Sequence, residues 1–426
     1  MTILGPGSQL PRSWLVVPFD QLAEYSAGRT PPRNEPAFWA NDEDSVPWVA
    51  ISDMAPFGVV STTAERVSRL AREEVFGRPP VPKGTLLMSF KLSIGRTAIL
   101  ALDAYHNEAI ISIAPGKEVE RDFLRFYLPT IDYAQVQDRA IKGNTLNRGK
   151  IDALPITLPP IAEQRGIAGV LAKVQRAVEV EDRRIAALKE LKAATMAKVF
   201  REGLRGEPLK QTEIGEIPES WDVYPLGRIC KLASGGTPAR DHPEYWGGPI
   251  PWVKTGEIAY HEITSTAERI TELGLASSAA RVFPRGTLLM AMYGQGVTRG
   301  KVAFLGIAAA TNQACAAFFP DRAKLQPEFL YAFCTFAYHR IRELGHGANQ
   351  KNLSGEILRG MAMPVPRNLA EQQSVYDLLA TIERRIEAAV RRNKGLQALF
   401  SSALNQLMTG QVRVTPLLEG KEDSDA

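Results

Sequence analysis

The sequence of 426 residues lacks most features of membrane-bound, secreted and redox-active proteins. It contains no run of eighteen apolar residues that would predict a transmembrane helix, and its first residues do not resemble a signal peptide. Its three cysteines show no C-x-x-C spacing, which is typical of proteins in a reducing compartment. We therefore expect a soluble protein of the cytoplasm.

Motifs of catalysis and cofactor binding are absent as well. There is no G-x-x-x-x-G-K-[ST] loop for ATP, and the glycines of "GQGVTRG" have the wrong spacing for a dinucleotide. The five histidines are scattered singly, so no metal site is indicated. No Asn-Pro-Pro-aromatic or Asp-Pro-Pro-aromatic tetrapeptide, the signature of amino-methyltransferases, occurs, and no acidic pair stands out as general acid and base. We expect a non-catalytic chain that binds no metal or cofactor itself.

An excess of charge of one sign is also missing. The chain has 51 Lys and Arg against 47 Asp and Glu, and this surplus of four does not by itself indicate nucleic-acid binding. What is present is an ordinary apolar fraction of 45%, which is enough for globular cores.

The sequence repeats itself. "LPRSWLVVPF" at 10–19 returns as "IPESWDVYPL" at 217–226, which separates Trp14 from Trp221 by 221 − 14 = 207 residues. Further pairs follow in the same order: "VPWVAISDM" and "IPWVKTGEI", "TTAERV" and "STAERI", "VPKGTLLMSF" and "FPRGTLLMAM", and "IAEQ" and "LAEQ". Because the offsets stay between 202 and 208, one unit of about two hundred residues occurs twice.

Each repeat begins with a globular part, over about 10–160 and 217–366. Short β-type runs such as "GTLLMSF" and "GTLLMAM" alternate with turns and short helical stretches, which predicts compact mixed α/β domains. The proline clusters "LPITLPP" and "MPVPR" close the two domains.

A long heptad pattern follows each proline cluster and predicts a helix of about forty residues, roughly 60 Å long. Glycine in "REGLRGE" and "LMTGQ" predicts where these helices end. The polar Asn393 on the seam is either incidental or a device that fixes the register of a helix pair. The seam comprises Ile167, Leu171, Val174, Val178, Ile185 and Leu188 in the first helix, and Val375, Leu379, Ile382, Ile386, Asn393, Leu396, Phe400 and Leu407 in the second.

These patterns predict an α+β protein with an internal pseudo-two-fold repeat. Two similar mixed α/β domains are expected at the two ends of a pair of long antiparallel coiled-coil helices. The predicted boundaries are 1–160 for the first domain, 161–205 for the first helix, 206–366 for a linker and the second domain, 367–410 for the second helix and 411–426 for a disordered acidic tail.

With these features, the chain resembles the specificity subunit of type I restriction-modification enzymes over nearly its whole length. The resemblance is carried by "IPESWDVYPLG", "SGGTPARDHPEYWGGPIPWVKTGEI", "GANQKNLSG" and "LFSSALNQLMTGQVRV". The first half departs from this pattern, with an insertion before Pro47 and with "KGNTLNRGK" where the glutamine of "GANQKN" would fall. These departures suggest that the two domains read different sequences.

The resemblance implies two target recognition domains that read a bipartite site on double-stranded DNA, with half-sites on the order of 10 bp apart. It also implies that the helices act as a spacer and dock two methyltransferase subunits and, through them, restriction and translocase subunits. S-adenosylmethionine, ATP and magnesium are expected on those partners, which methylate adenine N6. The chain itself would be a non-catalytic subunit.

Candidate DNA contacts are polar or basic residues in glycine-flanked loops, where side chains can reach base edges or phosphates. They are Lys91, Arg96, Lys142, Asn144, Asn147 and Arg148 in the first domain, and Gln295, Arg299, Lys301, Asn349, Gln350, Lys351 and Asn352 in the second. Each has a structural alternative as a solvated charge or a turn-forming asparagine. The repeated tryptophans are expected in the core and not against bases; they are Trp14, Trp48, Trp221 and Trp252.

The residues alone leave a second class of function open, a scaffold or adaptor whose two domains grip proteins. A fused nuclease or methyltransferase is disfavoured by the missing motifs. Retention of specific DNA together with purified methyltransferase subunits would separate a DNA reader from an adaptor.

Overall fold

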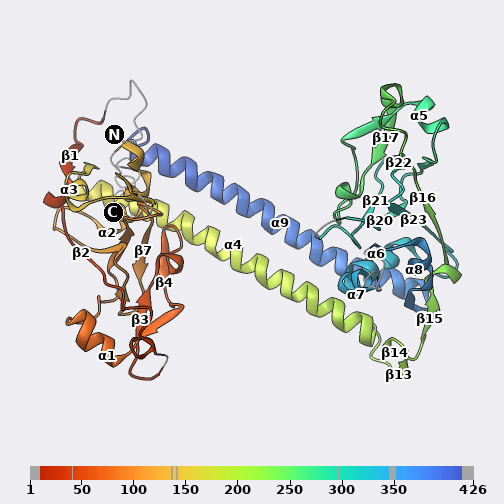
Figure 1. Ribbon diagram of the computed structural model, residues 1–426, viewed down its shortest axis with the longest axis horizontal. Coiled ribbons are helices and arrows are strands. Elements are labelled where there is room, and N and C mark those ends of the chain that lie inside the picture. Colours follow the sequence, from red (N-terminus) through yellow and green to blue (C-terminus); the bar gives the residue numbers. More distant parts are fainter. Residues whose placement is uncertain are drawn as a thin grey trace, which may run out of the picture. The chain divides into compact units, whose positions relative to one another are not determined.

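The computed structural model divides into two compact units. Unit 1 comprises Met1–Asp182 and Arg392–Ala426, and unit 2 comprises Arg183–Arg391. The structure describes residues 10–40, 42–135, 138–140, 143–294, 297–344 and 352–414 (Figure 1). Within that part of the chain, no helix is both long and apolar enough to cross a membrane.

Unit 1 is built on two sheets. The larger sheet has the order β2-β9-β6-β7-β4, with strands Ala23–Ala27, Ile110–Pro115, Leu86–Ser89, Thr97–Leu100 and Gly58–Val60. The smaller sheet has the order β5-β3-β8, with strands Glu65–Val67, Val46–Val49 and Tyr105–His106. The runs "LLMS" and "TAIL" form β6 and β7, and all eight of their residues are buried. This burial is expected for interior strands, whose sequences lack a regular apolar-polar alternation.

Shorter elements complete unit 1. Strand β1 (Leu15–Pro18) pairs antiparallel with β12 (Pro155–Leu158), so the predicted closing prolines return to the start of the domain. The short helices are α1 (Arg69–Ala71), α2 (Arg121–Tyr127) and α3 (Arg148–Asp152), and β10 (Asp138–Ala140) pairs with β11 (Gly143–Thr145).

Unit 2 repeats this plan. One sheet has the order β16-β23-β20-β21, with strands Cys230–Ser234, Cys315–Pro320, Leu288–Ala291 and Val302–Phe304. The other has the order β18-β17-β22-β19, with strands Glu268–Ile270, Trp246–Val253, Ala309–Thr311 and Val282–Phe283. The two-stranded sheets are β15 (Trp221–Pro225) with β24 (Ala362–Pro366), and β13 (Leu209–Thr212) with β14 (Gly215–Pro218). The short helices are α5 (Glu272–Ala276), α6 (Pro327–Phe336), α7 (Tyr338–Glu343) and α8 (Gly355–Gly360).

The two domains therefore share one strand order, which confirms the predicted repeat of mixed α/β domains. β2-β9-β6-β7 corresponds to β16-β23-β20-β21, and β5-β3-β8 corresponds to β18-β17-β22. Both small sheets contain one parallel pair, Val49 beside His106 and Val253 beside Thr311. Unit 1 differs by its fifth strand β4, which pairs parallel to β7.

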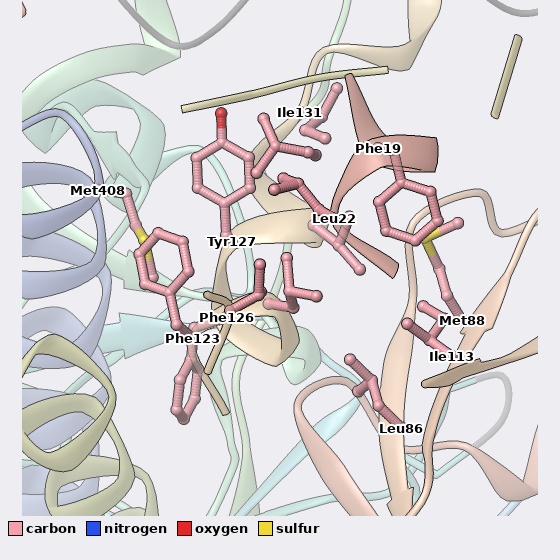
Figure 2. Packing of buried hydrophobic residues seen from close by; sticks show 14 of the residues in the cluster. Phe19, Leu22, Leu86, Met88, Ile113, Phe123, Phe126, Tyr127, Ile131 and Met408 are labelled. Atoms are coloured by element: carbon pink, nitrogen blue, oxygen red, sulfur yellow. The ribbon is translucent and has the colours of Figure 1, made fainter. Parts of the chain in front are cut away.

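Each domain has an aromatic core that includes residues of the long helices. In unit 1, Phe123, Phe126 and Tyr127 of α2 pack with Phe19 and with strand residues of the larger sheet (Figure 2). Met408, near the end of the second long helix, belongs to the same cluster. The predicted core position of the repeated tryptophans is confirmed, because Trp14, Trp48, Trp221 and Trp252 are at most 5% exposed.

The two long helices are α4 (Ile161–Glu202), of 42 residues, and α9 (Leu369–Met408), of 40 residues. Both end at the predicted glycines, since Gly203 and Gly410 adopt positive φ values of 66° and 70°, the left-handed conformation that glycine allows after a helix. In unit 1, the first half of α4 contacts the last half of α9, and Asn393 donates a hydrogen bond to Asp182. In unit 2, the last half of α4 contacts the first half of α9, and Lys192 pairs with Glu383. The predicted antiparallel pairing is confirmed within each unit.

The predicted seam follows the buried face of these helices unevenly. Buried positions are Ile167, Leu171, Val178, Val375, Leu379, Ile382, Ile386, Asn393, Phe400 and Leu407. Partly buried positions are Val174, Ile185, Leu188 and Leu396. Ile185 and Leu188, with weaker burial, both lie near the middle of α4.

Candidate nucleic-acid interface

In the first domain, the two loops with candidate DNA contacts lie side by side. Lys91 in the β6–β7 hairpin forms a β-bridge with Thr145, and the Leu146 N–H donates to the Phe90 carbonyl at 3.0 Å. Gly95 closes the hairpin with φ 81°, and a Cβ there would lie 2.3 Å from the ring of Tyr133, so no larger residue fits. The fold therefore brings together two segments that lie about fifty residues apart in the sequence.

The candidate side chains of this domain differ in what holds them. The Arg96 guanidinium is half-buried and donates to the carbonyls of Ile51 and Met54, each at 3.4 Å. Asn147 is the N-cap of α3, where its side chain accepts from the Lys150 N–H at 3.0 Å. Both geometries favour the structural alternative, because Arg96 supports a loop and Asn147 caps a helix.

The remaining candidates of the first domain are less constrained. Lys91 is half-buried with its ammonium 5.4 Å from the Phe90 ring, and Arg148 is exposed. Lys142 lies outside the described residues, and only the backbone of Asn144 is described, in β11. Their contact with DNA stays a prediction.

Tyr25 lies under this surface and stays protonated. Its hydroxyl donates to the Asp152 carboxylate at 2.6 Å, and the Arg148 guanidinium lies 5.9 Å from its ring. Burial and the Asp152 carboxylate raise the pKa of Tyr25 to about 12. The phenol therefore remains a hydrogen-bond donor that ties α3 to strand β2.

The second domain uses the same frame with a longer loop. The Leu353 N–H donates to the Met292 carbonyl at 3.1 Å, as Leu146 does to Phe90, and Gly300 adopts φ 87°, as Gly95 does. Three residues separate Lys91 from Gly95, whereas six, Gly294 to Arg299, separate Tyr293 from Gly300. The two domains thus present different loops on equivalent supports.

Helix α7 holds this longer loop. The Tyr338 hydroxyl donates to the Val297 carbonyl at 2.5 Å and accepts from Arg342 at 2.6 Å. Arg299 is only 8% exposed and donates to the Arg342 carbonyl at 3.3 Å, a position that favours a supporting role. Lys301 is half-buried with its ammonium 5.9 Å from the Tyr260 ring.

The other candidates of the second domain are Gln295, in the same loop, and four residues between α7 and α8. Asn352 is exposed. Gln295, Asn349, Gln350 and Lys351 lie outside the described residues. Among the described residues, no cluster of His, Cys, Asp or Glu is arranged to hold a metal ion.

Sequence reasoning missed the residues that anchor each domain to the long helices. The Trp14 indole N–H donates to Glu163 in the first turn of α4 at 3.0 Å, and Arg413 donates to the same carboxylate at 2.8 Å. Glu163 is 4% exposed, so the charge of Arg413 compensates a buried carboxylate. We call this trio the Trp-Glu-Arg clamp.

Unit 2 contains the same clamp. The Trp221 indole N–H donates to Glu371 in the first turn of α9 at 3.1 Å, and the Arg205 guanidinium lies 3.2 Å from that carboxylate. In both clamps the arginine follows the end of the other long helix, since Arg205 follows α4 and Arg413 follows α9. This explains why the tryptophan phrase and the "AEQ" motif both occur twice.

The glutamine of each "AEQ" motif is a second anchor. The Gln164 amide accepts from the Glu120 N–H at 2.8 Å and donates to the Glu118 and Pro159 carbonyls at 3.0 and 2.8 Å. Gln372 makes the three equivalent bonds, to Gln326, Lys324 and Pro366, at 2.8 to 2.9 Å. Both side chains are fully buried, so each first helical turn is tied to its domain.

A third repeated cluster stabilises the small sheet of each domain. Trp246 meets Trp252 edge-on at 5.1 Å, and the Arg240 guanidinium lies 3.8 Å from the Trp246 ring while it pairs with Glu268 at 2.8 Å. Hydrogen bonds from Arg240 and Lys254 lower the pKa of Glu268. The first domain builds the same cluster from Arg33, Trp39, Trp48 and Glu65.

Comparison with known proteins assigns this architecture. The chain matches the family described as "Type I restriction modification DNA specificity domain" twice, over residues 11–190 and 218–398. The MjaVIII type I restriction enzyme specificity subunit of Methanocaldococcus jannaschii is 22% identical over 96% of each chain. The MjaIX specificity subunit of the same organism is 29% identical over 45% of this chain and 44% of the relative.

Solved structures show the same fold. The S subunit of a type I restriction-modification system from M. genitalium has a TM-score of 0.61 at 12% identity, and the match covers 95% of this chain and 98% of that one. A chain from a study of complex assembly in the type I system has a TM-score of 0.55 at 16% identity, over 95% and 100%. With two matches that together span most of its length, the chain belongs to the family of type I restriction-modification specificity subunits.

Proposed function

We propose that this chain selects the DNA sequence for a type I restriction-modification complex, and that each domain reads one half of a bipartite double-stranded target. The observation that carries this proposal is the paired loops. Both domains place a β-hairpin beside the loop before a short helix, on equivalent supports and with different lengths and residues. Equivalent supports give both domains the same approach to a duplex, and different loops give them different specificity.

The exposed chemistry of these loops suits DNA. In the first domain Arg148 is exposed and Lys91 half-buried, and in the second domain Asn352 is exposed and Lys301 half-buried. Cations of this kind contact phosphates, while asparagine can read an adenine edge. Substitution of a phosphate contact is therefore expected to weaken binding to all sequences, and substitution of a base contact to relax specificity.

The long helices are proposed to dock two methyltransferase subunits and, through them, restriction and translocase subunits. Several apolar side chains on α4 and α9 point to solvent, among them Val180, Leu191 and Leu399, which are 50–54% exposed. A subunit that docks on these helices would cover such side chains. In this proposal the chain is non-catalytic and cytoplasmic, and S-adenosylmethionine, ATP and magnesium bind on the partners.

An exchange of one domain tests the assignment. Replacing residues 217–366 with the equivalent domain of a relative is expected to change one half of the methylated sequence and leave the other half intact. Genome-wide mapping of N6-methyladenine in cells that carry the methyltransferase subunit measures the result. The matched control replaces residues 10–160 and is expected to change the opposite half. Alteration of both halves by either exchange would contradict the assignment of one domain to one half-site.

A further inference from the structure

Three phenylalanine rings of unit 1 fill the space between helix α2, helix α9 and the loop that precedes β4. Phe57 stacks on Phe126 with ring centroids 5.8 Å apart, and Phe400 meets these two rings edge-on at 5.2 and 6.0 Å. Phe126 is fully buried and Phe400 is 8% exposed. Phe57 has a positive φ of 55°, and its carbonyl accepts a hydrogen bond from the Arg125 guanidinium. The three rings form a closed aromatic contact between domain and helix.

The equivalent loop and short helix of unit 2 carry different side chains. Tyr260 takes the place of Phe57, because it also has a positive φ, of 65°, and its carbonyl accepts from Tyr331 at 2.9 Å. Tyr331 thus corresponds to Arg125, and the next residue, Ala332, corresponds to Phe126. A methyl group stands where unit 1 has a ring.

The long helix differs in the same way. Phe400 lies 400 − 371 = 29 residues after the clamp glutamate of α9. The residue 29 positions after Glu163 in α4 is Lys192. Its ammonium pairs with Glu383, and a linear chain replaces the second ring.

As a result, unit 2 has a cleft where unit 1 is filled. Tyr260, Ala332 and Lys192 all line this cleft, which has a volume of about 550 Å³. Protein interiors are close-packed, and unit 1 shows that the same backbone frame accommodates two more aromatic rings. The cleft therefore has the size and the frame to receive a large apolar side chain.

The lining of the cleft has an apolar floor and a charged rim. Buried Met196 and Leu379 and the stacked rings of Phe304 and Tyr331, 5.4 Å apart, form the floor. The exposed side chains of the lining include charges of both signs, from Glu262, Glu387, Arg322 and Arg384, and also His261. An apolar pocket inside a charged rim is the composition of an interface hot spot, where one aromatic anchor contributes much of the affinity.

We infer that this cleft is the pocket into which a methyltransferase subunit inserts an aromatic side chain when it docks on unit 2. The inference rests on the proposed docking of methyltransferase subunits on the long helices. The inserted ring would take the place that Phe126 and Phe400 occupy in unit 1. Since unit 1 supplies these rings itself, the two docking sites of the chain are unequal, and only the site on unit 2 depends on a ring from the partner.

Introducing into unit 2 the phenylalanine rings that fill unit 1 tests the inference. Ala332→Phe restores the ring of Phe126, and Lys192→Phe independently restores that of Phe400. Both variants are expected to keep or raise the midpoint of thermal unfolding. Titration calorimetry with the purified methyltransferase subunit of the same system is expected to show two sites on the unaltered chain. On either variant, one of the two sites should weaken at least tenfold. Ala276→Phe, which adds the same ring on exposed α5, is the control and should bind as the unaltered chain does.

A measurement on the unaltered chain removes any dependence on folding of the variants. Hydrogen exchange is expected to slow in residues 327–336 and 376–387 when the methyltransferase subunit is added. Unchanged exchange there, or two unchanged sites on a folded filled variant, overturns the inference while the proposed function stands. If the unaltered chain binds no methyltransferase subunit at all, the proposed docking fails first.

Discussion

At the scale of single residues, the internal repeat allows each position to be compared with the equivalent position of the other half. The clamp residues are the same in both halves because each clamp ties its domain to the first turn of a long helix. Equivalent positions with different residues show where the two halves differ in structure. The tryptophans could be predicted as core residues from their apolar surroundings. Their partners could not, since Trp14 and Glu163 lie 149 residues apart and no local pattern encodes that distance.

His106 is one of the positions that differ. It is 1% exposed in the first domain, and burial lowers its pKa to about 4, from an ordinary value of 6.5. The second domain has Thr311 at the equivalent end of the parallel strand pair. Above pH 6.5 the histidine is neutral in both the folded and unfolded states. Below that pH the unfolded chain takes up a proton that the folded chain refuses, so stability falls as the pH drops towards about 4.

We therefore predict that lowering the pH from 7 to 5 costs the folded chain about 2 kcal/mol through this residue, at 1.36 kcal/mol per pKa unit. His106→Thr, the residue of the second domain, should remove most of that loss. Urea unfolding of both proteins at the two pH values measures the difference, and it is independent of any constant cost of the substitution. An equal pH response in the variant would mean that His106 is not the group responsible.

The candidate DNA contacts were only partly predictable. Glycine-flanked polar loops indicated two segments in each domain, and a backbone hydrogen bond joins the described ends of those segments in both domains. The role of each side chain depends on contacts across the fold. Arg96 turns to two loop carbonyls, Asn147 caps a helix and Arg299 is buried, and none of these outcomes follows from loop composition.

At the scale of elements, the long helices were the most predictable part of the fold. A heptad pattern with a terminal glycine is a local signal, and it located α4 and α9 to within a few residues. The strands were predictable as short apolar runs, but their order was not. β9 lies between β2 and β6, an arrangement set by packing of distant segments.

The helices also yield a prediction about the DNA target. Inserting four residues into each helix, between Arg183 and Arg184 and between Arg391 and Arg392, keeps an antiparallel pair matched and adds about 6 Å to each helix. If the helices set the gap between half-sites, the preferred gap should grow by one or two base pairs, at about 3.4 Å per base pair. Both half-sites should stay the same. Methylation mapping measures the gap, and an unchanged gap would contradict the spacer role.

At the scale of the whole molecule, the two halves of the repeat depend on each other. The domain of each half is closed by an arginine that follows the long helix of the other half. In unit 2 this arginine, Arg205, is connected to Trp221 by continuous chain through the β13–β14 hairpin. In unit 1 the same contact joins Arg413 to Trp14, residues 399 positions apart in the sequence (413 − 14).

A circularly permuted chain tests whether the connections across the two clamps are equivalent. Joining residue 414 to residue 10 through a short Gly/Ser linker and opening the chain between Glu213 and Ile214, at the exposed hairpin turn, should preserve every clamp contact. The permuted chain is expected to fold with a thermal midpoint within a few degrees of the original and to direct methylation to the same sites. A control opened inside α4, between Ala186 and Ala187, should lose folding. Failure of the first permutant would show that the two connections are not equivalent.

The clamps therefore connect the polypeptide in the same way as a closed ring would. Continuous chain crosses the clamp of unit 2, whereas the clamp of unit 1 holds together segments from opposite ends of the described chain by side-chain contacts. In a closed ring, the fold does not depend on where the N- and C-termini are placed. A gene in which the second half precedes the first would encode the same two domains, and recombination that exchanges whole halves between related genes would combine domains without disturbing either of them.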